Sequence, residues 1–301
     1  MSTINTGNHP AALWPGVRKF VMGKYDEHPL ECKQIFDMKK SKMAYEEDVG
    51  ITSFGLAPVK DQGAAYTYDS HTQGGTRRYT HIAYGMGYSV TREEMDDNQY
   101  SDKSFNRGEM LAFSFRTTKE IVAANVLNRG FNASYTGIDG KEMLATDHAT
   151  LAGSQSNELA VAADFSEAAL EDLLIQIHQA KNDRGLEIAI SPKKLIIPAD
   201  LAFEAERILN STLRSGTANN DMNAVNGKIP GGIVVNHYLT DADAWFVQTN
   251  APSGLLGFMR TAFEFKKDND QATDNALAKA YERYSFGWTD WRGIYGSPGA
   301  A

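Results

Sequence analysis

Histidine and acidic side chains are the residues of this 301-residue chain that are best suited to acid–base or metal chemistry. The seven histidines are scattered along the sequence, with no HExxH pattern or comparable cluster of ligands. Asp147 and His148 are adjacent and have the residue types of a catalytic pair. A Thr-Asp-His-Ala run in a predicted loop is more often part of a turn, so we predict no catalytic residue, no metal ligand and no cofactor.

Three further motifs resemble binding sites only in part. Gly85 and Gly87 begin like a dinucleotide-binding motif, but they lie in a strand pattern and lack its third glycine. The acidic turn at 268–270 begins like a calcium loop, but no glycine follows where that loop needs one. The acidic run at 46–48 fits the start of a strand better than a divalent-ion site. These motifs favour a structural or binding role over an enzyme.

Composition narrows the class of protein further. With 42% hydrophobic residues the chain can bury a full core, in one large or two modest domains. A formal charge of −8 argues against a free-standing nucleic-acid binder, although not against a surface that faces nucleic acid without gripping it. Cys32 is the single cysteine, so an intrachain disulfide is excluded. No apolar run approaches the ~20 residues that span a bilayer, and we expect a soluble protein of a reducing cytoplasm.

The longest predicted element is a helix from Thr91 to about Gly130. Thr91 and Glu94 have the spacing of a capping box, and Gly130 supplies a C-terminal stop. An apolar stripe at helical spacing consists of Leu111, Phe115, Thr118, Val122 and Val126. Four basic residues are predicted to face water, namely Arg107, Arg116, Lys119 and Arg129. Such a helix would be roughly 55–60 Å long, so other elements are expected to lie along it.

The segments before this helix predict an arm and a ribbon. Residues 1–50 lack sustained periodicity and are expected to form an extended arm, with a short helix at 16–24 as the alternative. From 82 to 90 apolar and small residues alternate as in a half-buried strand, and its partner is expected within 54–68. An isolated two-stranded ribbon is at best marginally stable in water. Its aromatic face is therefore expected to be covered, by its own domain or by a neighbouring molecule.

The segments after the helix predict a second unit and a return to long strands. Helices and short strands alternate over roughly 164–250, and a polar loop at 213–232 interrupts them. Alternating residues near 257–288 predict long strands that lie along the helix. From the residues alone, the chain is an α+β protein with features of assembly.

Specific strings give the chain a resemblance to the major capsid proteins of tailed bacteriophages, which have the Hong-Kong-ninety-seven-type shell fold. The likeness extends in matching order from Leu13 onward. It is carried by EEDVG (46–50), FGLAPVK (54–60), RYTH (78–81), TRE (91–93), VAANVLNR (122–129), PKKLIIP (192–198), SGTANND (215–221), VVNHYLTD (234–241), DND (268–270), ERYSFGW (282–288) and GIYGSP (293–298).

The resemblance implies a fold with a long spine helix, long β-strands, a two-stranded extended loop and a mixed α/β axial domain. The implied domains are an N-terminal arm at 1–50, an extended loop at 51–90, a peripheral domain at 91–163 and 251–288, and an axial domain at 164–250 and 289–301. It implies self-assembly into pentamers and hexamers of an icosahedral shell that encloses double-stranded DNA in the virion. Alternatives that stay open are an encapsulin-like nanocompartment, a phage tail or decoration protein, and an enzyme with an unrecognised site.

The resemblance also implies partners. The chain lacks the long charged N-terminal extension of some relatives, which suggests a separate scaffolding protein or a processed form. A portal and a decoration protein are further expected partners, and DNA would lie on the inner face without sequence-specific binding. No membrane is involved. The candidate inter-subunit contacts are Trp14, Lys60, Tyr66, Tyr68, Arg77, Arg78, Tyr79, Asn219, Asn220 and Asp221.

Overall fold

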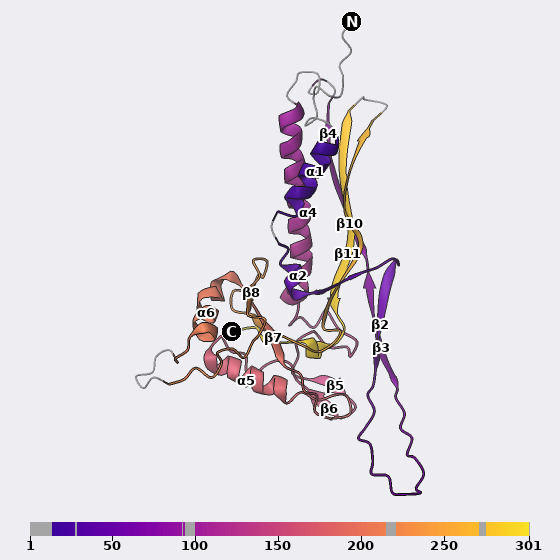
Figure 1. Ribbon diagram of the computed structural model, residues 1–301, viewed down its shortest axis with the longest axis vertical. Coiled ribbons are helices and arrows are strands. Elements are labelled where there is room, and N and C mark those ends of the chain that lie inside the picture. Colours follow the sequence, from indigo (N-terminus) through magenta and orange to yellow (C-terminus); the bar gives the residue numbers. More distant parts are fainter. Residues whose placement is uncertain are drawn as a thin grey trace.

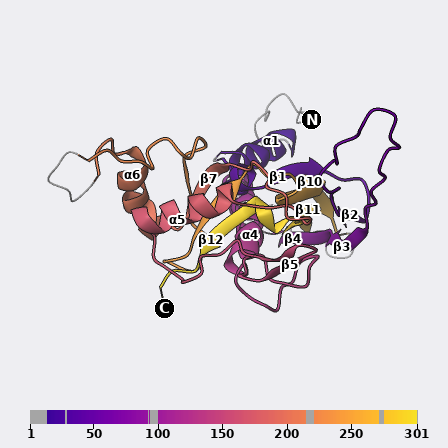
Figure 2. The same cartoon turned by 90° about the horizontal axis from the view of Figure 1, so that it is seen from below.

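The computed structural model describes residues 14–27, 29–91, 93, 100–214, 221–270 and 275–300. They form an elongated molecule with a long upper body and a wider lower body (Figure 1). A loop between strands β2 (Tyr45–Ile51) and β3 (Gln73–Thr80) projects from the lower body, on the opposite side from helix α6 (Ala202–Asn210) (Figure 2). The mixture of helices and strands confirms the predicted α+β class.

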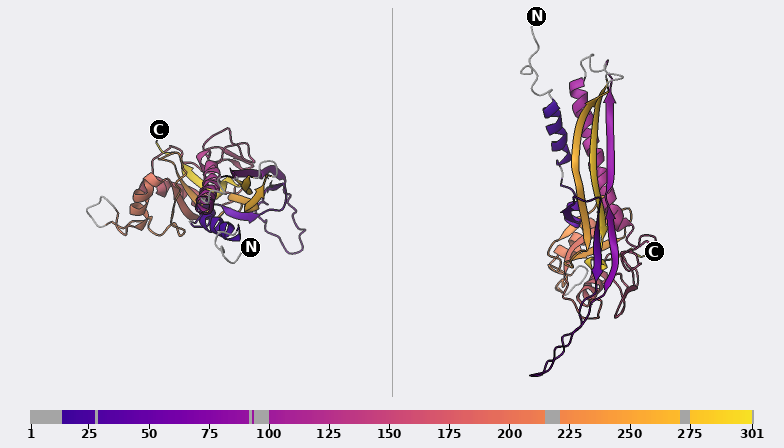
Figure 3. Two further views of the ribbon diagram at one scale, coloured as in Figure 1. Left: turned by 90° about the horizontal axis from the view of Figure 1, so that it is seen from above. Right: turned by 90° about the vertical axis from the view of Figure 1, so that its right-hand side faces the viewer.

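The upper body is a long sheet with a helix along it. The sheet has the order β1 (Asp37–Lys40), β10 (Leu255–Asn269), β11 (Ala276–Trp288), β4 (Ile82–Val90). Helix α4 (Tyr100–Asn128) runs beside these strands (Figure 3). Between helix and sheet, Phe263 stacks on Tyr25 at 4.5 Å between ring centroids and meets Phe115 edge-on at 5.4 Å. Small buried residues on β11, Ala278 and Ala280, complete this core beside the helix.

The buried line of α4 differs from the predicted stripe in its second half. Leu111 and Phe115 are buried as expected. After Phe115, however, the line continues at intervals of four through Lys119, Ala123 and Leu127. Lys119 was expected to face water and is 2% exposed. A pattern of apolar residues cannot show that a buried lysine has a buried carboxylate to pair with, and this is the physical reason for the error.

Lys119 connects three elements through a buried cluster of polar side chains, which it forms with Tyr25 and Glu282. Its Nζ pairs with Glu282 of β11, which is fully buried, and donates to Tyr25 Oη at 2.6 Å. The Tyr25 hydroxyl in turn donates to Glu282 Oε1 at 3.0 Å. Lys119 Nζ also lies 5.2 Å from the ring centroids of Tyr25 and Tyr284. The pair thus connects the N-terminal segment, α4 and the long sheet.

The prediction of an extended N-terminal arm is wrong over the first described residues. They form helix α1 (Trp14–Tyr25), which packs along α4, and the alternative of a short helix is correct. A Cβ at Gly108 of α4 would lie 2.5 Å from Val21 Cγ2. Gly108 therefore allows the close approach of α1, and α4 runs through it without a break. The predicted capping box falls partly on Glu94, which lies outside the described residues.

The ribbon also differs from its predicted limits. It consists of β2 (Tyr45–Ile51) and β3 (Gln73–Thr80), with Glu47 opposite Arg78 and Asp48 opposite Arg77. Strand β4 pairs with β11 in the long sheet and not with the ribbon. Residues 52–72 extend beyond the ribbon without forming a strand. Alternation predicts a strand but not its partner, which explains the wrong pairing.

The lower body contains a second sheet, of order β12 (Ile294–Ser297), β9 (Trp245–Thr249), β7 (Pro192–Ile197), β8 (Ile233–Val235). Helices α5 (Glu167–His178) and α6 (Ala202–Asn210) lie beside it. Its core is centred on the buried Trp245 and Phe246. Short elements complete the chain: α2 (Cys32–Ile35), β5 (His148–Thr150), β6 (Gly153–Gln155), η2 (Ala199–Leu201) and η3 (Trp291–Gly293). Among the residues that the structure describes, no helix is both long enough and apolar enough to cross a bilayer.

Candidate functional site

The projecting loop at 52–72 carries an unusual set of exposed apolar side chains. Phe54, Leu56, Val59, Tyr66 and Tyr68 are between 57% and 96% exposed. A cluster of exposed apolar residues is characteristic of a surface that binds another protein. The loop is thus the clearest candidate for a functional surface, and it contains three of the predicted inter-subunit contacts, Lys60, Tyr66 and Tyr68.

Few interactions join the two sides of this loop. At its base the hydroxyl of Thr52 accepts from the N–H of Thr72 at 2.8 Å, and Thr52 N–H donates to the Thr72 carbonyl at 3.1 Å. Toward the tip, the ammonium of Lys60 lies 4.9 Å from the ring centroid of Tyr66. Lys60 is exposed, as an inter-subunit contact in this loop would require.

The two arginines of the ribbon have partners within their own chain. Arg78 pairs with Glu47 across the ribbon at 2.6 Å and lies 4.2 Å from the ring centroid of Tyr45. Arg77 donates to the carbonyl of Thr136 at 2.7 Å. Pairing of these arginines with a neighbouring subunit stays a prediction, and it requires them to exchange or share these partners.

Tyr79 does not fit the predicted role of an aromatic buried on a neighbour. It is 3% exposed within its own chain, where it packs on Phe258 and hydrogen-bonds the hydroxyl of Thr289. Burial raises the pKa of Tyr79 to about 12. The sequence did not show which residues of β3 face the body.

The remaining predicted contacts lie at the ends of the described chain segments. Trp14 begins α1, and its side chain lies outside the described part of the structure. Asn219 and Asn220 lie outside the described residues as well. Asp221 is exposed, and its carbonyl accepts from Arg214 N–H at 2.8 Å. Asp221 thus stays available for an inter-subunit contact.

Sequence reasoning missed one residue of this site, Arg184. It comes from a turn of the lower body and hydrogen-bonds both sides of the projecting loop, at Ser53 and Ser70. A single arginine in a turn, 114 residues from Ser70, gives no sequence signal for such a contact.

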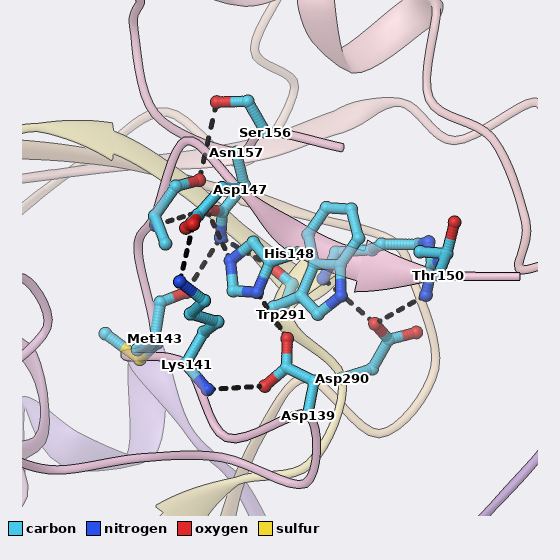
Figure 4. Close-up of polar contacts among 12 residues, drawn as sticks. Asp139, Lys141, Met143, Asp147, His148, Thr150, Ser156, Asn157, Asp290 and Trp291 are labelled. Atoms are coloured by element: carbon cyan, nitrogen blue, oxygen red, sulfur yellow. Dashed lines mark hydrogen bonds and ion pairs between the residues drawn. The ribbon is translucent and has the colours of Figure 1, made fainter. Parts of the chain in front are cut away.

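A buried polar cluster surrounds His148, the residue that was considered for catalysis (Figure 4). His148 is fully buried, and its ring stacks on Trp291 with centroids 4.4 Å apart. Its Nδ1 lies 2.6 Å from Asp139 Oδ2, and its Nε2 lies 3.0 Å from Asn157 Oδ1. The neighbouring Asp147 pairs with a lysine instead, so the two adjacent residues do not act together.

The hydrogen bonds of Asn157 show which of its side-chain atoms faces His148. Its amide nitrogen donates to the carbonyls of Met143 (2.8 Å), Trp291 (3.1 Å) and Ile294 (2.9 Å). Its amide oxygen therefore faces His148 and also accepts from the N–H of Ala145 at 2.9 Å. Since an amide oxygen can only accept, His148 Nε2 must donate to it. The carboxylate of Asp139 lies against the other ring nitrogen, so both ring nitrogens of His148 have partners within the chain.

The pKa of Asp139 reflects its contact with His148. Burial raises the pKa of Asp139, but the hydrogen bond and positive charge of His148 outweigh this and hold the pKa below its usual value. Both ring nitrogens of the fully buried His148 are occupied by Asp139 and Asn157, so neither is available to take a proton from a substrate. The cluster therefore fastens the loop at 137–158 to the C-terminal segment. In the residue ranges that the structure describes, no group of three potential metal ligands converges.

Comparisons with known proteins agree with a role in assembly. A sequence profile of the phage capsid protein family matches residues 74–297. The virus-like particle of Pyrococcus furiosus is similar in structure, with a TM-score of 0.55 and 13% identity over 94% of this chain and 98% of that chain. The capsid of a native GTA particle has a TM-score of 0.58 and 13% identity, with 91% of each chain covered.

A third similar structure is the bacteriophage JBD30 capsid decorated with minor capsid protein trimers. Its TM-score is 0.55, at 14% identity over 71% of this chain and 92% of that chain. No curated protein sequence matches significantly. At these identities the structural likeness shows the fold, which is that of capsid shells, and the sequence profile covers most of the chain. The chain therefore belongs to the phage capsid protein family and is a structural protein of the phage capsid.

Proposed function

We propose that this chain is the major capsid protein of a tailed-phage head, and that its projecting loop at 52–72 joins neighbouring copies. In this proposal copies assemble into pentamers and hexamers of an icosahedral shell around double-stranded DNA. The observation that carries the proposal is the set of exposed apolar side chains on a loop that its own chain does not cover.

Burial of this loop on a neighbouring copy supplies the driving force for assembly. A large apolar side chain contributes about 1.5–3 kcal/mol when it is fully buried. The loop offers five such side chains in each copy. In the proposed shell each copy presents one loop and receives one from a neighbour. Exposed ion pairs contribute only ~0–1 kcal/mol, so those of the ribbon set register more than strength.

The phage assignment rests on the sequence profile more than on the fold. A virus-like particle from Pyrococcus furiosus has a similar fold, so the fold alone does not distinguish shells by their contents. The net charge of −8 suits an inner wall that holds DNA loosely. A scaffolding protein, a portal and a decoration protein are the further partners in this proposal, and the assembled chain is part of the virion.

Replacing both loop tyrosines, Tyr66→Ser and Tyr68→Ser, is expected to prevent shell formation while leaving the fold intact. Both side chains are largely exposed within the chain, so thermal unfolding of the unassembled protein should be unchanged. Two lost rings should weaken each subunit contact by more than tenfold. The yield of particles, measured by sedimentation, checks this.

The matched control keeps the rings and removes only the hydroxyls, in Tyr66→Phe with Tyr68→Phe. It is expected to assemble as the parent chain does. Particles from the serine variant at the parental yield would show that the loop does not join subunits.

A further inference from the structure

The pairing between the two sides of the projecting loop ends at a defined point. Strands β2 and β3 pair up to Ile51 and Gln73, and Thr52 and Thr72 continue the contact by one step. Three residues further along each side, the carboxylate of Asp69 accepts from the main-chain N–H groups of Gly55 and Ser70, both at 2.8 Å. Beyond this point no strand forms, so this is where the loop leaves the body.

Arg184 contacts the loop at this point from outside. Its Nε donates to the carbonyl of Ser53 at 3.2 Å, and a terminal nitrogen donates to the carbonyl of Ser70 at 2.8 Å. The same guanidinium lies 3.7 Å from Asp69 Oδ1. One planar group thus spans both sides of the loop. In the described part of the chain, no other residue of the body hydrogen-bonds residues 53–71.

The turn that carries Arg184 is itself held firmly. The side chain of Asn182 accepts from the N–H groups of Arg184 (2.9 Å) and Leu186 (2.8 Å), which closes the turn. Arg292 holds the turn by donating two hydrogen bonds, to the Lys181 carbonyl at 2.8 Å and to Asp183 Oδ1 at 2.8 Å. Arg292 is buried, so this anchor belongs to the core of the lower body.

We propose that Arg184 is a positioning residue that sets the direction in which the loop at 52–72 leaves the body. The inference rests on the proposed function of that loop as the subunit contact. The tip extends roughly 26–30 Å beyond the Arg184 contacts if both sides of the loop are extended, since each residue adds about 3.3 Å. A change of direction by about 20° would then move the tip by about 9–10 Å, which is enough to miss its site on a neighbour.

The chemistry of the contact requires arginine in particular. Both hydrogen-bond acceptors are main-chain carbonyls, so these two bonds depend on the path of the loop, while the ion pair with Asp69 depends on the charge of Arg184. A guanidinium offers several donors in one plane and reaches two carbonyls together. Lysine keeps the charge but not the planar fork. The variant Arg184→Lys therefore separates the fork from the charge.

The direct test is the distance from the loop tip to the body in the full chain. Spin labels on Gln62→Cys in the tip and Glu204→Cys on α6 measure it by pulsed electron resonance. The native Cys32 is buried and does not compete for label. Dilution of labelled protein into an excess of unlabelled protein keeps each distance within one chain, whether or not shells form.

With Arg184 present, we expect one narrow distance distribution. Arg184→Ala should broaden it, and Arg184→Lys should broaden it nearly as much. Hydrogen exchange of the Gly55 and Ser70 amides should become about tenfold faster in both variants, since the fastening beside them is lost. Arg207→Ala, which removes an exposed arginine on α6, is the matched control and should change neither reading.

Outcomes of the test separate this inference from the proposed function. An unchanged distance distribution in Arg184→Ala overturns the positioning role, whatever happens to assembly. A broadened distribution with misassembled or missing shells supports it. A broadened distribution with normal shells would show that Arg184 orders the loop but that the direction of the loop does not control assembly. This result overturns the inference that the loop must leave the body in one direction to reach its site on a neighbour.

Discussion

Replacing Lys119 by methionine is expected to reduce the free energy of unfolding by about 3–5 kcal/mol, because it leaves Glu282 buried without its charge partner. Glu282 is fully buried, and after the change its remaining donor is the hydroxyl of Tyr25. In a chain of this size the loss corresponds to a fall of roughly 10 °C in Tm, which calorimetry or circular dichroism of the unassembled protein measures.

The pH dependence of this loss has a definite sign. Burial raises the pKa of Glu282, while the charge and hydrogen bond of Lys119 oppose that rise. Without Lys119 the folded chain would hold the Glu282 proton more tightly than the unfolded chain does. Its stability would then fall as pH rises above the ordinary glutamate pKa, so the penalty of Lys119→Met should be larger at pH 7 than at pH 5.

Removing the whole buried group gives the matched control. The triple change Tyr25→Phe, Lys119→Met and Glu282→Leu replaces every member with an apolar side chain of similar size. Such replacements are often neutral or stabilising, so most of the lost stability should return. A triple variant as unstable as Lys119→Met alone would show that packing, and not the buried charge, causes the loss.

Asn157→Asp is expected to have a comparable effect in the lower body, with a loss of more than about 3 kcal/mol. The change is nearly isosteric, so it creates no cavity. It replaces an amide nitrogen that donates to three buried carbonyls with an oxygen that repels them. Thermal unfolding of the unassembled protein again measures the loss.

Asn226→Asp is the matched control for this change. Asn226 also donates through its amide nitrogen, to the Ser211 carbonyl at 3.0 Å, but it is exposed. Its replacement is expected to change stability by less than about 0.5 kcal/mol. If Asn157→Asp were as mild, the assignment of the Asn157 amide nitrogen as the donor to the three carbonyls would be incorrect.

Structural features that depend on the residues of one segment alone could be predicted from the sequence. The long helix, the long strands near 257–288 and the α+β class follow from periodicity within each segment. The exposed aromatics of the loop, Tyr66 and Tyr68, were predicted because a ribbon of two strands cannot bury them itself.

The sequence could not show which distant segments and residues of the same chain each element contacts. Strand β4 has the same alternation whether it pairs with the ribbon or with β11, and only the fold selects β11. Lys119 looks like a solvated residue until Glu282, 163 positions away, is placed beside it. Tyr79 and Arg184 were misjudged or missed for the same reason, since their roles depend on residues distant in the chain.

The most direct test of the account is an electron cryomicroscopy reconstruction of particles formed by this chain, co-expressed with the other head proteins of its phage. We expect a closed icosahedral shell in which residues 52–72 of each copy lie on an adjacent copy, with Tyr66 and Tyr68 buried in the contact. Particles in which this loop stays in solvent, or a chain that remains monomeric under these conditions, would contradict the account.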